Sequence, residues 1–208
     1  MILLISGATV VLRGIIPRTE ACGRVGVLAT PRAPALWARD LNVPMAADND
    51  AFRAWNERRF LRMLDTHRPI ASRMAWVAVR DVPGNAKATL EQWFIWAPIV
   101  RESGYRVAFV IQDGIENIGL PAADAYFIGG TDRYRSSGAL RTLVQQLVDN
   151  RCWVHVGRVN SLTRYRYWDS LGCTSCDGTQ HSRWADKYVL WMLRRTQGRQ
   201  LALETLFD

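Results

Sequence analysis

The side chains best suited to chemistry in this sequence are carboxylates and an amide that follow short apolar runs. They are Asp48 after Pro44–Ala47, Asp81 after Met74–Val79, Gln112 and Asp113 after Arg106–Ile111, and Asp177 after Cys173–Cys176. Two carboxylates at a sugar centre suit glycosyl transfer, because one attacks the anomeric carbon while the other moves the proton of the leaving group. A carboxylate and a glutamine amide together can read the edge of a guanine-like base.

Asp177 is the central candidate among these residues. The apolar runs Trp153–Val156 and Cys173–Cys176 flank the helix-length segment Ser161–Leu171, which predicts a β–α–β unit. Because Asp177 closes the second run and precedes Gly178, its carboxylate can project into a pocket above the sheet. It can equally cap the next helix or turn, and this segment alone leaves both interpretations open.

Eight apolar runs are predicted as strands, and most are continuous rather than alternating, which indicates a parallel sheet buried on both faces. They are Met1–Gly7, Val25–Pro31, Pro44–Asp50, Met74–Val79, Arg106–Ile111, Ala125–Ile128, Trp153–Val156 and Cys173–Cys176. Helices are predicted from about Phe52 to Thr66 and over Ala86–Ser103, Gly138–Asn150, Ser161–Leu171 and Arg183–Arg195.

The fold class is therefore α/β, and the expected architecture is a compact TIM-like (β/α)₈ barrel. We expect a single domain over residues 1–208, which is short for a fold that usually takes about 250 residues. A doubly wound open sheet is the alternative architecture, but no G-x-G-x-x-G follows the first strand.

In such a barrel the carboxyl ends of all strands meet at one mouth, where active sites of this fold lie. Two further features follow predicted strands: Gly129-Gly130, which lets the backbone approach a flat ring closely, and Arg158. We therefore expect the carboxylates, Gln112, the diglycine and Arg158 to surround one site.

The cysteines and histidines give little support to a metal site. They are Cys22, Cys152, Cys173 and Cys176, and His67, His155 and His181. The C-x-x-C of Cys173 and Cys176 is typical of zinc or redox sites, but a second ligand pair is missing. Within a strand these two cysteines would point to opposite faces. We interpret them as small buried residues and expect neither a metal nor a cofactor.

The chain carries 27 Lys and Arg against 19 Asp and Glu, a net charge of +8, which suits a nucleic-acid partner. An arginine-rich surface also arises in soluble proteins from GC-rich genomes, so both interpretations stay open. The candidate phosphate contacts are Arg133, Arg135, Arg158, Arg164 and Arg166.

No apolar run is long enough to span a membrane, and Met1–Ile5 is too short for a signal peptide, which predicts a cytoplasmic protein without a membrane partner.

Six short motifs occur in an order that resembles the tRNA-guanine transglycosylase superfamily. They are AADNDAF at 46–52, VRDV at 79–82, FVIQDG at 109–114, FIGGT at 127–131, HVGRVNS at 155–161 and GCTSCDGT at 172–179. The match spans about residues 25–195. The chain looks most similar to the compact phage and actinobacterial branch, related to the DNA-guanine transglycosylases that place 7-deazaguanines into DNA.

The resemblance implies roles for individual residues. Asp177 matches the nucleophile, Asp48 the general acid/base, Asp81 and Gln112 the base-reading residues, and Gly129-Gly130 the backbone that contacts the base. The family's D-S-G-G-F motif reads DNDAF here, so the local backbone must differ. No cysteine follows Asp177, so we expect no zinc subdomain, and DNA is favoured over tRNA as the nucleic-acid partner.

The implied reaction replaces guanine in DNA with a 7-deazaguanine through a covalent aspartyl-glycosyl intermediate, after the nucleotide is flipped out of the duplex. In one alternative the same aspartates hydrolyse the glycosidic bond, as in a DNA glycosylase or a nucleoside hydrolase. In another the barrel binds nucleic acid without catalysis. A homodimer and a partner subunit both stay open, and a phage-encoded protein would act in the host cytoplasm.

Overall fold

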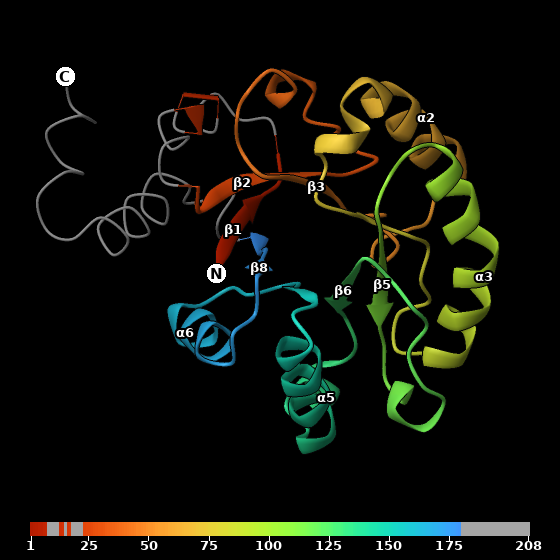
Figure 1. Ribbon diagram of the computed structural model, residues 1–208, viewed down its shortest axis with the longest axis vertical. Helices are drawn as coiled ribbons and strands as arrows, with labels where there is room; N and C mark the ends of the chain where they lie inside the picture. The colour runs from red at the N-terminus through yellow and green to blue at the C-terminus, as the bar shows by residue number, and fades with distance from the viewer. Residues whose placement is uncertain (8–12, 15, 18–22, 180–208) are drawn as a thin grey trace, which may run out of the picture.

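The computed structural model describes residues 1–7, 13–14, 16–17 and 23–179, and these contain a closed barrel of eight parallel strands (Figure 1). The strands are β1 (Ile2–Ile5), β2 (Val25–Ala29), β3 (Met45–Ala47), β4 (Val77–Ala78), β5 (Val107–Ile111), β6 (Ala125–Ile128), β7 (Trp153–Val156) and β8 (Ser175–Cys176). Each strand pairs with the next, and β1 pairs with β8 to close the barrel. The predicted α/β barrel is confirmed, whereas the predicted helix Arg183–Arg195 lies outside the described residues.

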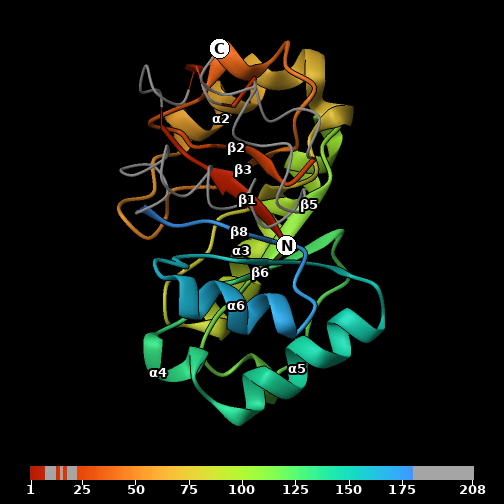
Figure 2. The same cartoon turned by 90° about the vertical axis from the view of Figure 1, so that its left-hand side faces the viewer.

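Helices surround the barrel (Figures 1 and 2). They are α2 (Glu57–His67), α3 (Ala86–Glu102), α4 (Asp132–Arg135), α5 (Gly138–Asp149) and α6 (Leu162–Ser170). Each begins after an Asn, Thr or Ser whose side chain accepts a hydrogen bond from a backbone N–H of the first turn, as at Asn56 and Ser161. The predicted helices in these regions are confirmed apart from their ends.

Short connections explain how a barrel fits into so short a chain. A single 3₁₀ turn, η2 (Leu36–Ala38), lies between β2 and β3, and another, η4 (Ile115–Asn117), lies between β5 and β6. A third, η3 (Arg68–Arg73), follows α2. A full helix is usual after each strand of this fold, so the two replacements save residues.

The helix predicted to start near Phe52 begins five residues later, at Glu57. Asp50 adopts a left-handed conformation with φ of 61°, and Asn56 is extended and caps α2, so the segment between them is not helical. Phe52 is consequently no core residue, since 68% of it is exposed.

The core has two layers, one inside the barrel and one between the strands and the helices. The inner layer comprises Leu4, Leu28, Ala46, Trp76, Ala78, Ala108, Val110, Ala125 and Phe127. Alanines at four inner positions leave room for the fully buried indole of Trp76. Alternate residues of each strand face the outer layer. Burial on both faces explains why the strands read as continuous apolar runs.

The two cysteines of the C-x-x-C are both buried, as expected, but do not point to opposite faces of a strand. Cys173 precedes β8, and it belongs with Cys176 to the hydrophobic cluster outside the barrel. Their thiols are free, as is that of Cys152. Across the described part of the chain, no helix combines the length and the hydropathy needed to cross a membrane.

Candidate active site

A cavity of about 550 Å³ opens at the carboxyl ends of the strands. The strand ends supply much of its polar lining, because several strands continue inward by one more position beyond the inner core layer. Asp48 follows Ala46 in this alternation, Gln112 follows Val110 and Asp177 follows Ser175. The volume suits a nucleoside-sized ligand.

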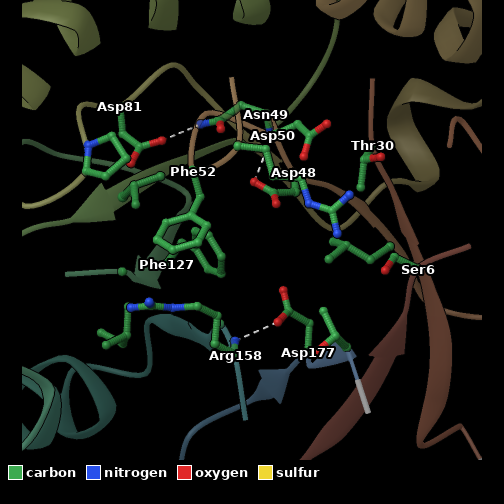
Figure 3. Close-up of a pocket in the computed structure, with 18 of the residues that line it drawn as sticks. Ser6, Thr30, Asp48, Asn49, Asp50, Phe52, Asp81, Phe127, Arg158 and Asp177 are labelled. Atoms are coloured by element: carbon green, nitrogen blue, oxygen red, sulfur yellow. Dashed lines mark hydrogen bonds between the residues drawn. The ribbon is translucent and has the colours of Figure 1, made fainter. Parts of the chain in front are cut away.

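Asp48 and Asp177 come from opposite halves of the sequence and point toward one another across this cavity (Figure 3). Asp48 lies just after β3 and Asp177 just after β8. The structure therefore brings together the two carboxylates that the sequence analysis singled out for glycosyl transfer. Asp81, Gln112, Gly129, Gly130 and Arg158 line the same cavity.

The surroundings of Asp48 favour its protonated form. Burial, followed by repulsion from the carboxylates of Asp177 and Asp81, raises the pKa of Asp48 from 3.8 to about 7. The backbone N–H of Asn49, which donates to Asp48 Oδ1 at 2.7 Å, acts in the opposite direction. Asp48 can therefore both donate and accept a proton near neutral pH, as a general acid/base must.

Asp177 is held by the loop that follows β7. Its Oδ1 accepts a hydrogen bond of 2.7 Å from the backbone N–H of Arg158, and its backbone N–H donates to Val156. The other carboxylate oxygen, Oδ2, points into the cavity (Figure 3). The side chain is 17% exposed. The carboxylate of Asp177 thus contacts the loop after β7 and lines the cavity, as the pocket interpretation requires.

Asp81 and Gln112 form one network at the side of the cavity. Gln112 Nε2 donates to Asp81 Oδ2 at 2.6 Å, and Asn49 Nδ2 donates to Asp81 Oδ1 at 2.8 Å. Gln112 Oε1 accepts from the backbone N–H groups of Gly84 and Gly130, at 2.8 and 2.9 Å. All three polar side chains are buried, and burial raises the pKa of Asp81 against these hydrogen bonds. The network fixes Asp81 in one orientation while leaving some of its carboxylate lone pairs unused.

Glycine is required at positions 129 and 130 by the packing of neighbouring side chains as well as by the expected approach of a base to the backbone. A Cβ at Gly129 would lie 2.8 Å from Gln112 Nε2, and one at Gly130, whose φ is 73°, would lie 2.7 Å from the ring of Tyr134. The N–H of Gly129 donates to Ile111 of β5, and that of Gly130 to Gln112. Both N–H groups are thus already paired within the protein, so the expected contact from this backbone to a base would have to come from a carbonyl or from rearrangement.

Of the five arginines expected to contact phosphate, only Arg158 lines the cavity. It has a left-handed φ of 56°, donates through Nη2 to the carbonyl of Gly130 and lies 4.8 Å over the ring of Phe52. Arg133, Arg164 and Arg166 are exposed on α4 and α6.

Arg135 differs from the other four because it is only 7% exposed. Burial, followed by repulsion from Arg158, lowers its pKa to about 10, and Arg164 adds to that effect. Arg135 contributes positive charge near the cavity but little accessible surface.

The sequence analysis assigned no site role to several lining residues, among them the four side chains Asn49, Phe52, Arg32 and Arg53. Arg32 forms an ion pair of 2.8 Å with Asp50, and Asn49 is 2% exposed. All four lie a few residues beyond the end of β2 or β3, and that position is the signal that could have identified them.

In the described residues no group of three or more His, Cys, Asp or Glu side chains is arranged to hold a metal ion.

A scan against models of known protein families finds no match to this chain, and a search of curated proteins finds no significant match either.

Proposed function

We propose that the protein is a glycosyltransferase that exchanges guanine in DNA for a 7-deazaguanine through a covalent intermediate on Asp177. The observation that carries this proposal is the pair of carboxylates, Asp48 and Asp177, facing each other across one cavity of nucleoside size. Their surroundings differ: the pKa of Asp48 is raised to about 7, whereas a backbone N–H donates to Asp177. One protonated and one ionised carboxyl group is what a double-displacement reaction at a sugar requires.

In the first step Asp177 Oδ2 attacks C1′ of the nucleotide. The C1′–N9 bond breaks, its electron pair leaves with the guanine, and Asp48 donates a proton to the departing base. In the second step the incoming 7-deazaguanine loses its N9 proton to Asp48 and attacks C1′. The bond between C1′ and Asp177 then breaks, which returns both carboxyl groups to their starting protonation states.

Asp81 and Gln112 are the groups placed to read the base. Their side chains lie beside one another at the cavity wall, and the carboxylate of Asp81 can accept from the N1–H and amino group of a guanine ring. The exposed ring of Phe52 lines the mouth and offers a face on which a flipped base can stack.

Arginines supply the charge needed for a DNA partner. Arg53 and Arg158 line the cavity, and Arg133, Arg164 and Arg166 are exposed on the surface of α4 and α6, where Arg164 lies 3.9 Å from Asp132. Together with the net charge of +8, this surface favours a polyanion over a free nucleoside as the substrate.

Incorporation of labelled guanine or of a labelled 7-deazaguanine into duplex DNA tests the proposal. The wild type should incorporate label and form an adduct that survives denaturation, whereas Asp177→Asn should do neither. Asp65→Asn is the matched control, because Asp65 is an exposed aspartate on α2 remote from the cavity lining.

The other outcomes would contradict the proposal in different ways. Release of guanine without incorporation would identify a hydrolase, and DNA binding without either reaction would identify a non-catalytic binder. The same assay with tRNA decides which nucleic acid is the substrate, and DNA affinity that is independent of salt would contradict the role of the basic surface.

A further inference from the structure

A chain of buried polar side chains lies beneath Asp177. His155 and Ser175 are both fully buried, and they occupy neighbouring positions on β7 and β8. Trp153 Nε1 donates to Ser175 Oγ at 2.9 Å, and Ser175 Oγ lies 2.9 Å from His155 Nδ1. At the other end, His155 Nε2 lies 3.6 Å from Asp177 Oδ2. The chain therefore leads from the barrel interior to the carboxylate at the cavity.

The direction of these contacts assigns the tautomer of His155. An indole N–H can only donate, so Ser175 Oγ accepts from Trp153. Ser175 Oγ has a second lone pair, so it can either donate its hydroxyl proton to His155 Nδ1 or accept a proton from it, and donation leaves the ring proton on Nε2. The opposite tautomer would turn the lone pair of Nε2 toward the carboxylate of Asp177, which is repulsive.

The imidazole is fixed in position and kept uncharged. Its ring packs against those of both Trp76 and Phe127, with centroids 4.7 and 4.6 Å away. Burial lowers the pKa of His155, and the positive charge of Arg135 acts in the same direction against the carboxylate of Asp177. Among the described side chains no acceptor lies within hydrogen-bond distance of Nε2, which is fully buried.

We propose that His155 is a positioning residue for Asp177, and that its neutral imidazole directs the Nε2–H at the carboxylate oxygen that bonds to C1′. The catalytic part of this inference rests on the proposed function; the tautomer does not. A movement of about half an ångström closes the gap to a hydrogen bond, and such contacts often tighten only when substrate is bound.

The N–H would act most strongly when the covalent intermediate breaks down. As the bond between C1′ and Asp177 Oδ2 breaks, its electron pair returns to that oxygen. A donor already aimed at the oxygen stabilises the charge that develops there without reorganising. Ser175 and Trp153 then act one step further away, because they determine which nitrogen of His155 carries the proton.

Proton–nitrogen NMR of histidine-labelled protein tests the tautomer without any substrate, so it remains decisive even if base exchange is never observed. His155→Phe identifies the signal by its loss. We expect a neutral ring protonated at Nε2 around neutral pH, a mixture of tautomers in Ser175→Ala, and an altered Nε2 signal in Asp177→Asn. A ring protonated at Nδ1, or on both nitrogens, would overturn the inference.

Single-turnover kinetics test the effect on the reaction. His155→Phe keeps the aromatic packing and removes the donor, so the intermediate should break down about 10- to 100-fold more slowly, while its formation should slow much less and substrate affinity should stay unchanged. Ser175→Ala should give a smaller loss of rate, and His155→Gln, which retains an N–H, should restore part of it.

Val154→Ala is the control for a purely structural effect. Val154 lies between Trp153 and His155 but packs in the outer core, so its truncation should lower stability without changing the tautomer. If the wild type exchanges bases and both Ser175→Ala and any folded His155 variant match its rates, His155 does not act on Asp177. If the tautomer is as expected but no protein form exchanges bases, the proposed function fails and the structural assignment stands.

Discussion

Replacing Asp48 with asparagine should stabilise the protein increasingly as the pH rises. Asparagine has the shape of the protonated acid, carries no charge and keeps the oxygen that accepts from the backbone N–H of Asn49. In the wild type the pKa of Asp48 is raised from 3.8 to about 7. The pKa of Asp48 is higher in the folded state than in the unfolded state. Protonated Asp48 therefore stabilises the folded state relative to ionised Asp48, and this contribution is complete below about pH 4, where the group is protonated in both states. That contribution is lost as the pH rises from about 4 to about 7, where the buried group must ionise beside two other carboxylates.

The magnitude follows from the difference between the two pKa values. Each pH unit between them changes the free energy of unfolding by about 1.4 kcal/mol, so the interval from pH 5 to pH 7 amounts to at most about 3 kcal/mol. Asp48 is half-buried and keeps partial contact with solvent in the open cavity, and screening there reduces the figure by about half, to between about 1 and 2 kcal/mol. For a chain of this size that is a difference in Tm of about 3–6 °C.

Urea unfolding at several pH values between 5 and 8, followed by tryptophan fluorescence, measures this difference. The advantage of Asp48→Asn over the wild type should grow up to about pH 7 and then stay constant, while Asp65→Asn should show no such trend. An advantage that is the same at pH 5 and pH 8 would refute the assignment of a raised pKa to Asp48. The Asp48→Asn substitution should also abolish base exchange, since an asparagine side chain cannot transfer the proton.

Three further substitutions probe the rest of the site. Asn49→Leu leaves Asp81 with one donor fewer in a buried site, so it should cost about 2 kcal/mol in urea unfolding and weaken guanine binding in calorimetry. Gly130→Ala forces a Cβ into a left-handed backbone and against the ring of Tyr134, which should lower Tm and disturb the cavity wall. Phe52→Ala removes a side chain that is 68% exposed, so it should leave Tm unchanged and raise KM for the nucleic acid.

The barrel and many of the residues at its carboxyl end could be predicted from the sequence, because successive side chains of a strand point alternately to the two faces of the sheet. Continuous apolar runs indicated strands buried on both faces, and polar residues followed several of these runs. Asp48, Gln112 and Asp177 were therefore predictable as groups on one side of a barrel. Only the structure places their side chains in one cavity, because register and strand tilt depend on pairing between strands far apart in the chain.

The loops after the strands were not predictable in the same way. Apolar spacing assigned Phe52 to a helix, but a left-handed Asp50 and the cap at Asn56 place it at the cavity mouth instead. Likewise, nothing local distinguishes Arg135, which is buried, from its exposed neighbour Arg133. Loop conformation depends on long-range hydrogen bonds, such as that between Asn49 and Asp81, which leave no periodic signal.

Gathering Asp48, Asp81 and Asp177 around one cavity is costly to the fold, because burial and mutual repulsion raise the pKa of Asp48 to about 7. A purely structural role does not account for this cost, since neutral amides would fill the same positions without repulsion. The surroundings of the three groups also differ: Asp81 is tied to two amide side chains, Asp177 accepts from a backbone N–H above a buried imidazole, and Asp48 accepts from the backbone of its neighbour. Under the proposed function, such unequal environments would distinguish a base reader, a nucleophile and a proton carrier within one site. The difference in free energy of unfolding between Asp48→Asn and the wild type therefore measures how much stability this arrangement of carboxylates costs the protein.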